Sequence, residues 1–187
     1  FDIEKSLTDR IESIKEEAET AIRQGSTCLV LSDKNISNKK ASIPSILTVG
    51  AVHSHLVKHG LRGYCSLNVE CSDAMDTHSF AILIGVGATT VNPYLAIDSI
   101  YQRFEKKLFG QSDFKTCVNK FKKSIDAGLL KIMSKMGISV ISSYRGGCNF
   151  EAVGLSRAIV SDYFPGMSSR ISGIGIIGIE KKIKELH

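Results

Sequence analysis

The sequence alternates short apolar runs with longer segments in which apolar residues recur every three or four positions. The apolar runs have the length and composition of strands and lie at residues 27–33, 65–70, 89–93, 138–142 and 149–154. The periodic segments between and after them indicate helices at residues 44–59, 79–88, 95–109, 113–136 and 156–164. Strands joined by helices pair in parallel through right-handed crossovers. The pattern therefore predicts an α/β fold, either a partial βα-barrel-like array or an open sheet.

Three parts of the chain are distinguished by these patterns. Residues 1–25 are predicted to form an N-terminal amphipathic helix, with Asp2 as its N-cap and Gly25 at its end. Residues 26–164 contain the α/β pattern, and the first apolar run, TCLVLSD, is typical of a strand covered on both faces. Residues 165–187 are rich in Gly and Ser before a charged helix, which is typical of a connector. The first residue is Phe1, which suggests a piece of a longer chain.

Composition bounds the class of protein. A chain of 187 residues with 43% hydrophobic residues can bury one core of ordinary size. Its five cysteines are scattered and form no C-x-x-C pair, which favours reduced thiols and a cytoplasmic location over a disulfide framework. No apolar run has the length of a membrane span, so we expect no membrane partner. The cysteines are Cys28, Cys65, Cys71, Cys117 and Cys148.

Positive charge is concentrated between Arg103 and Lys135, where nine basic residues face three acids, while the whole chain has a net charge of +5. Such a patch can bind nucleic acid, which makes a basic nucleic-acid-binding module one alternative function. However, the stretch has no interleaved aromatic residues suited to stacking on bases, and no nucleic-acid motif accompanies it. A solvated helix face, or a face that meets an acidic partner, is the preferred interpretation.

The tail SGIGIIGIE matches the G-x-G-x-x-G spacing of dinucleotide-binding turns through Gly173, Gly175 and Gly178. That motif binds phosphate only when a strand precedes it, a helix follows it and a second strand returns. Pro165 and Gly166 are expected to break any preceding strand, and nine residues follow the last glycine. We therefore interpret the match as chance and expect the glycines to serve chain geometry.

Several stretches, in order along residues 27–180, closely resemble the large subunit of glutamate synthase. The most specific are VNPYLAI (91–97) and GLLKIMSKMGIS (128–139), and they are accompanied by IPSILTVGAVHSHLVKHGLR (43–62), HSFAILIGVGA (78–88), FEAVGLS (150–156) and SRISGIG (169–175). The resemblance places the chain in the later part of the central domain and in the connector toward the FMN domain.

This resemblance implies a function that belongs to the whole enzyme more than to this chain. Glutamate synthase releases ammonia from glutamine in one domain and uses it at an FMN domain, beside an iron–sulfur cluster, to convert 2-oxoglutarate to glutamate. The central domain spaces and couples the two. We therefore expect a structural spacer without catalytic residues or a cofactor of its own, inactive alone. Its expected partners are the remaining domains or a second copy, bound through exposed apolar ends. The candidate contacts at these ends are Ile3, Leu7, Ile11 and Ile14, and Ile174, Ile176, Ile177 and Ile179.

Polar residues at the predicted strand ends supply a rival function, that of a stand-alone small-molecule-binding α/β enzyme. In parallel sheets the carboxyl ends of the strands converge on one rim, where ligands usually bind. The candidates at or near such ends are Asp33, Glu70, Asn92, Ser142 and Arg145, of which Arg145 suits a carboxylate or phosphate. The same residue types also cap helices, tie loops or meet a neighbouring domain. His78, beside two acids, is a further candidate ligand or local hydrogen-bond partner.

No metal site is predicted. His53 and His55 are two residues apart on a helix, so their side chains point in different directions. His55 and His59 have the i,i+4 spacing that brings side chains together, but no acid of an H-E-x-x-H type lies between them.

Overall fold

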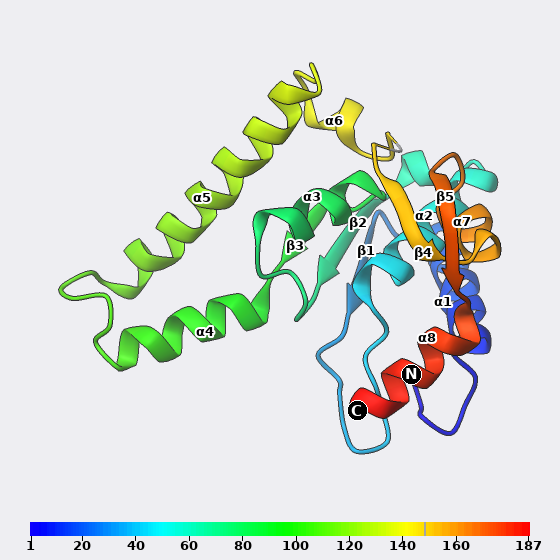
Figure 1. Ribbon diagram of the computed structural model, residues 1–187, viewed down its shortest axis with the longest axis horizontal. Helices are drawn as coiled ribbons and strands as arrows, with labels where there is room; N and C mark the ends of the chain where they lie inside the picture. The colour runs from blue at the N-terminus through cyan, green and yellow to red at the C-terminus, as the bar shows by residue number, and fades with distance from the viewer. Residues whose placement is uncertain (148) are drawn as a thin grey trace.

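The computed structural model describes residues 1–147 and 149–187 (Figure 1), so Cys148 lies outside the described part of the chain. The elements follow in the order α1 (Leu7–Arg23), β1 (Cys28–Ser32), α2 (Ser45–Lys58), the 3-10 turn η1 (Arg62–Tyr64), β2 (Ser66–Glu70), α3 (Thr77–Gly85), β3 (Thr90–Asn92), α4 (Tyr94–Glu105), α5 (Phe114–Lys135), α6 (Ile141–Tyr144), β4 (Glu151–Leu155), α7 (Arg157–Tyr163), β5 (Ser168–Ile174) and α8 (Ile176–Leu186).

The strands form two small parallel sheets. One has the order β1-β2-β3, and the other pairs β4 with β5. The predicted α/β fold with parallel strands is confirmed, and within the described residues it takes the open form, without a closed barrel. The central strand β2 buries Leu67 and Val69, with 0% and 2% of their surface exposed.

The expectation that β1 is covered on both faces is wrong. Its residues alternate between exposed and half-buried, and Val30 is 61% exposed. Leu29 and Leu31 pack against the main core from the other face. As an edge strand with one covered face, β1 needs apolar residues only at alternate positions.

The N-terminal helix starts later than predicted, because Ser6, and not Asp2, is its N-cap and accepts a hydrogen bond from the Asp9 amide at 3.4 Å. Leu7 and Ile11 are buried in the core that α1 shares with α2. The C-terminal helix α8 also packs on α1, where the Leu7 amide donates to Glu180 Oε2 at 3.0 Å. Leu7 and Ile11 are therefore covered by the chain's own helices and are not available to a second copy. Self-association through the ends of the chain stays a prediction.

Two segments differ from their predicted structure. Residues 138–142 are not a strand; Ile141 and Ser142 are the first two residues of the short helix α6, whose Tyr144 is fully buried. The predicted connector contains a strand, β5, because β4 provides it with a parallel partner. Pro165 and Gly166, which has φ +87°, form the turn before β5 and do not break it.

Helices α4 and α5 form a hairpin, here called the arm (residues 94–135), that extends away from the sheets (Figure 1). The arm contacts the rest of the chain chiefly where α5 packs on α3. The arm contains the basic stretch of residues 103–135. No helix in the described part of the chain is long and apolar enough to cross a membrane.

Candidate functional site

The carboxyl ends of β1, β2 and β3 meet at one edge of the first sheet, as predicted, and place Glu70 at the centre of a polar cluster. Glu70 accepts hydrogen bonds from Ser32 Oγ at 2.7 Å and from Asn92 Nδ2 at 3.2 Å. Its Oε1 also lies 2.7 Å from Lys34 Nζ. The hydrogen bond from Lys34, followed by that from Ser32, holds the pKa of Glu70 below its usual value. The carboxylate is therefore ionised at pH 7, and three donors of the chain bind it.

Asp33 extends this cluster, which we call the rim cluster (Ser32, Asp33, Lys34, Glu70, Ser72, Asn92 and Tyr94). Its Oδ2 accepts hydrogen bonds from the Ser72 amide at 2.9 Å and from Ser72 Oγ at 2.7 Å. Lys34 Nζ lies 5.1 Å from the ring centroid of Tyr94, within the range of a cation–π contact. Burial, followed by the carboxylate of Asp33, raises the pKa of the Tyr94 hydroxyl. The residues predicted from the sequence do not include Lys34, Ser72 or Tyr94, although each lies within two residues of a strand end.

The other three predicted site residues lie elsewhere. His78 is exposed in the first turn of α3, two residues after the N-cap Asp76. Ser142 is exposed on α6, because the strand expected to place it at the rim is absent. Arg145 follows α6, and its Nε is buried without a hydrogen-bond partner among the described residues. The structure thus brings Asp33, Glu70 and Asn92 together.

A second polar group surrounds His53, on α2. Arg62 Nε donates to His53 Nδ1 at 3.1 Å, while the other guanidinium nitrogens bind the carbonyl oxygens of Cys65 and Gly87 at 2.7 and 2.8 Å. Burial, followed by the positive charges of Arg62 and Arg145, lowers the pKa of His53 to about 4. His53 is therefore neutral at pH 7 and accepts through Nδ1. Arg62 ties α2, β2 and the loop after α3 together.

The cavity beside His53 is small. It has a volume of ≈ 150 Å³ and is bounded mainly by apolar groups of α2 and of the segment from Tyr163 to Met167. Pockets that bind small organic ligands are usually about 300–1,000 Å³. The cavity is accordingly too small for a flavin or a nucleotide.

The resemblance found in the sequence implies FMN and an iron–sulfur cluster in the whole enzyme. The cysteines that the structure describes show whether this chain can hold the cluster. The described cysteines Cys28, Cys65, Cys71 and Cys117 are free thiols, and no three of them come together. The one group of three potential metal ligands in the described part of the chain contains no cysteine. The described cysteines therefore do not supply the ligands of an iron–sulfur cluster.

The fold and the rim cluster define a parallel α/β domain whose polar edge is bound in part by its own side chains, while Asp33 Oδ1 is buried without a hydrogen-bond partner among the described residues. Residues 1–156 match the family model of the glutamate synthase central domain. The chain is 55% identical over 183 residues to the glutamate synthase [NADPH] large chain of Azospirillum brasilense and 42% identical over 186 residues to that of Bacillus subtilis. It is 41% identical over 189 residues to the ferredoxin-dependent glutamate synthase of Spinacia oleracea.

The matches cover 98%, 100% and 93% of this chain but only 12% of each relative. The chain therefore belongs to the glutamate synthase central domain family and spans about 12% of the length of the curated relatives that it matches. The resemblance found in the sequence is confirmed.

Proposed function

We propose that this chain is the structural spacer of a glutamate synthase large chain, which holds the glutamine-hydrolysing domain and the FMN domain in register and performs no chemistry itself. The observation that carries this proposal is the set of contacts that Glu70 makes at the carboxyl edge of the first sheet. Its carboxylate already binds Ser32, Lys34 and Asn92. These three contacts come from the ends of β1 and β3 and from the residue pair that follows β1, so the carboxylate of Glu70 joins the ends of three strands. This structural role supports a spacer.

The arm supplies the surface for contact with neighbouring domains. Leu108 and Leu130 are each 66% exposed there, and Tyr101 is 49% exposed. Large exposed apolar side chains are typical of a surface that meets another protein unit. The surplus of positive charge on residues 103–135 favours an acidic surface opposite. We infer that the partner of the arm is another domain of the same enzyme. A cytoplasmic location stays a prediction that rests on the reduced cysteines.

The proposal is tested in a glutamate synthase large chain that contains this domain. The double variant Leu108→Glu/Leu130→Glu places two charges on the apolar surface of the arm. We expect glutamine hydrolysis, measured alone, and 2-oxoglutarate amination, measured with added ammonia, to persist. Glutamine-dependent glutamate formation should fall roughly tenfold or more, because small displacements between reacting centres are costly. Ile36→Glu, at a site 48% exposed on the loop between β1 and α2, is the matched control and should leave all three rates unchanged.

Glu70→Gln in the same large chain distinguishes the spacer from the small-molecule enzyme. A spacer keeps both partial reactions after this substitution, provided that circular dichroism shows the native fold. Loss of a partial reaction in the folded Glu70→Gln protein would assign the rim cluster to chemistry and overturn the proposal.

A further inference from the structure

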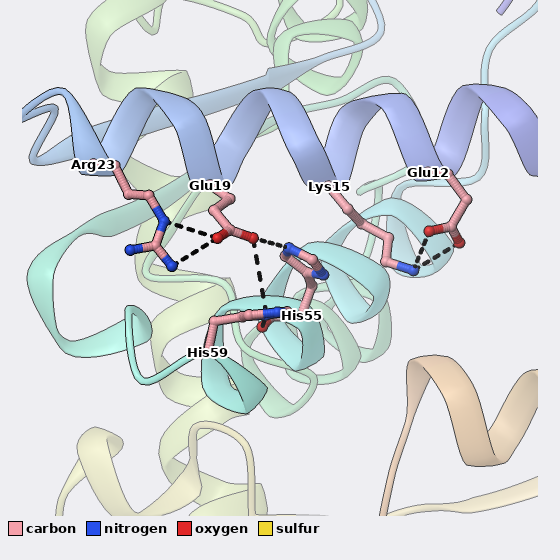
Figure 2. Close-up of polar contacts among 6 residues, drawn as sticks. All are labelled: Glu12, Lys15, Glu19, Arg23, His55 and His59. Carbon is pink, nitrogen blue, oxygen red and sulfur yellow. Dashed lines mark hydrogen bonds and ion pairs between the residues drawn. The ribbon is translucent and has the colours of Figure 1, made fainter.

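A third polar cluster lies where α1 packs on α2, toward the amino ends of β1 and β2, since each helix ends a few residues before its strand begins. His55 occupies the last turn of α2, and His59 is its C-cap. Glu19 points from α1 toward both rings (Figure 2). The acid that the sequence analysis sought between the two histidines is thus supplied by a different helix, 36 residues earlier than His55.

The three side chains already lie at the spacing of ligands around one ion. Glu19 Oε2 is 2.7 Å from His55 Nε2 and 3.9 Å from His59 Nδ1, and one ligand atom from each residue lies within 4.8 Å of the others. Ligand atoms about 2.1 Å from a tetrahedral Zn²⁺ are about 3.4 Å apart. The distances of 2.7 and 3.9 Å fall on either side of this value, so small side-chain rotations suffice to admit the ion.

The donor set matches zinc in chemistry as well as in spacing. Two imidazoles and one carboxylate leave a fourth position for water, which is the ligand pattern of open zinc sites. A glutamate side chain is ordinarily ionised at neutral pH, so Glu19 can supply negative charge to a cation. The side chains of Glu19 and His55 are 22% and 15% exposed, and that of His59 is 37% exposed, which leaves a path for the ion from solvent.

Two existing contacts limit the affinity of the site. Arg23 Nε donates to Glu19 Oε1 at 2.8 Å, which orients the carboxylate and leaves Oε2 for the histidines, but its charge repels a cation (Figure 2). His59 Nδ1 lies 2.8 Å from the His55 carbonyl oxygen, so coordination through Nδ1 exchanges a hydrogen bond for a metal bond. Because both contacts compete with the ion, we expect moderate affinity for zinc.

We propose that Glu19, His55 and His59 bind one Zn²⁺ ion, with water as the fourth ligand, and that the ion joins α1 to α2. This inference is independent of the spacer function, since the site lies outside the rim cluster and takes no part in the chemistry of the enzyme. Ion binding to the folded state alone stabilises the chain by mass action. The site therefore makes the packing of the N-terminal helix responsive to zinc.

The test uses the untagged chain and titration calorimetry with Zn²⁺ alone, followed by Co²⁺ as a spectroscopic probe. We expect one ion per chain, a zinc-dependent rise in the thermal midpoint, and the strong visible absorption of tetrahedral Co²⁺. Glu19→Gln, His55→Gln and His59→Gln should each weaken binding at least about tenfold. The matched controls are Glu12→Gln, which breaks an ion pair with Lys15 on the same helix, and His78→Gln, an exposed histidine elsewhere; both should bind zinc like the parent chain.

Arg23→Gln should change the zinc affinity in the opposite direction from the ligand substitutions. Removal of its charge should tighten zinc binding severalfold, whereas it should have no effect on ions that adhere to unrelated surface groups. His59→Gln changes an exposed helix cap and leaves the core intact, so it reports on binding even if His55→Gln unfolds. The proposal is overturned if zinc fails to bind at millimolar concentration, or if the folded His59→Gln and Glu19→Gln chains bind it as tightly as the parent.

Discussion

We expect the replacement of Gly173, on β5, by alanine to push β5 away from β4 and to destabilise the second sheet. A Cβ atom at this position would lie 2.2 Å from the carbonyl oxygen of Gly154 and 2.6 Å from its carbonyl carbon. Ordinary contact begins at 3.4 Å, so the shortfall is about 1.2 Å. The obstacle is backbone of β4 and cannot rotate away. The strands must therefore part, which weakens nearby bonds such as that from the Ser156 amide to the Ile174 carbonyl oxygen, at 2.9 Å.

The cost follows from overpacking and from weakened ladder bonds. Overpacking in a tight site typically costs about 1–3 kcal/mol, and each lost hydrogen bond about 0.5–1.5 kcal/mol. We expect Gly173→Ala to lower the free energy of unfolding by about 2–3 kcal/mol, which corresponds to roughly 4–12 °C in the thermal midpoint for a chain of this size. The chain has no tryptophan, so unfolding in urea is followed by far-ultraviolet circular dichroism.

Gly175, two residues later, is the matched control. It is the N-cap of α8 with φ −90°, and the nearest atom to an added Cβ is Ser156 Oγ at 3.9 Å. Gly175→Ala should lower the free energy of unfolding by no more than about 1 kcal/mol, because it meets no close atom and only replaces glycine by a poorer N-cap residue. Equal effects of the two substitutions, whether large or small, would refute the argument from close approach of β4 and β5.

Three further measurements test the fold and its titrations. Burial and neighbouring charges lower the pKa of His53 to about 4, from 6.5, so the unfolded chain binds the extra proton between these values. Stability should fall as pH drops from 6.5 toward 4, by at most about 3 kcal/mol, and His53→Gln should flatten this part of the stability profile from urea unfolding. The pKa of Glu70 is depressed by Lys34, so its contribution is present above pH 4.5 and is lost as pH falls below it; Glu70→Gln should remove that acid-dependent loss in the same assay. Leu56→Ala, at a fully buried site, should cost about 2–5 kcal/mol, whereas Leu130→Ala, 66% exposed on the arm, should stay within about 0.5 kcal/mol by thermal unfolding.

The elements that the sequence predicted correctly have strong local causes. Strand β2 alternates buried and half-buried positions, and helix α5 begins after the N-cap Asp113, which accepts a hydrogen bond from the Thr116 amide, and ends before Gly137. Strand β5 has no such cause. Its sequence, SSRISGI, is mostly exposed and contains one of the chain's tightest glycines, so only pairing with β4 makes it a strand.

The polar clusters likewise include residues that local patterns predict and contacts that only tertiary packing creates. Asp33, Glu70 and Asn92 were found because strand ends of a parallel sheet meet at one edge, a rule that needs only the strand assignments. Ser142 was wrongly placed because its strand was wrong. The contact of Glu19 with His55 was missed because it depends on how α1 packs on α2, and no pattern within either helix reports that packing.

The shape of the arm has a consequence for how the molecule opens. Few side chains of α4 and α5 are buried, namely Ala96, Cys117, Ile125 and Met133, whereas half of the residues of α2 are buried. Segments with little buried surface exchange their amide hydrogens through local openings that leave the rest of the fold intact. Amides of α4 should accordingly exchange with solvent long before those of α2. Helix α5 is held more firmly, because Ile125 belongs to the main core and Met133 to the second core. We therefore expect α4 and the turn between the two helices to open first, while α5 stays on α3 and both sheets stay paired.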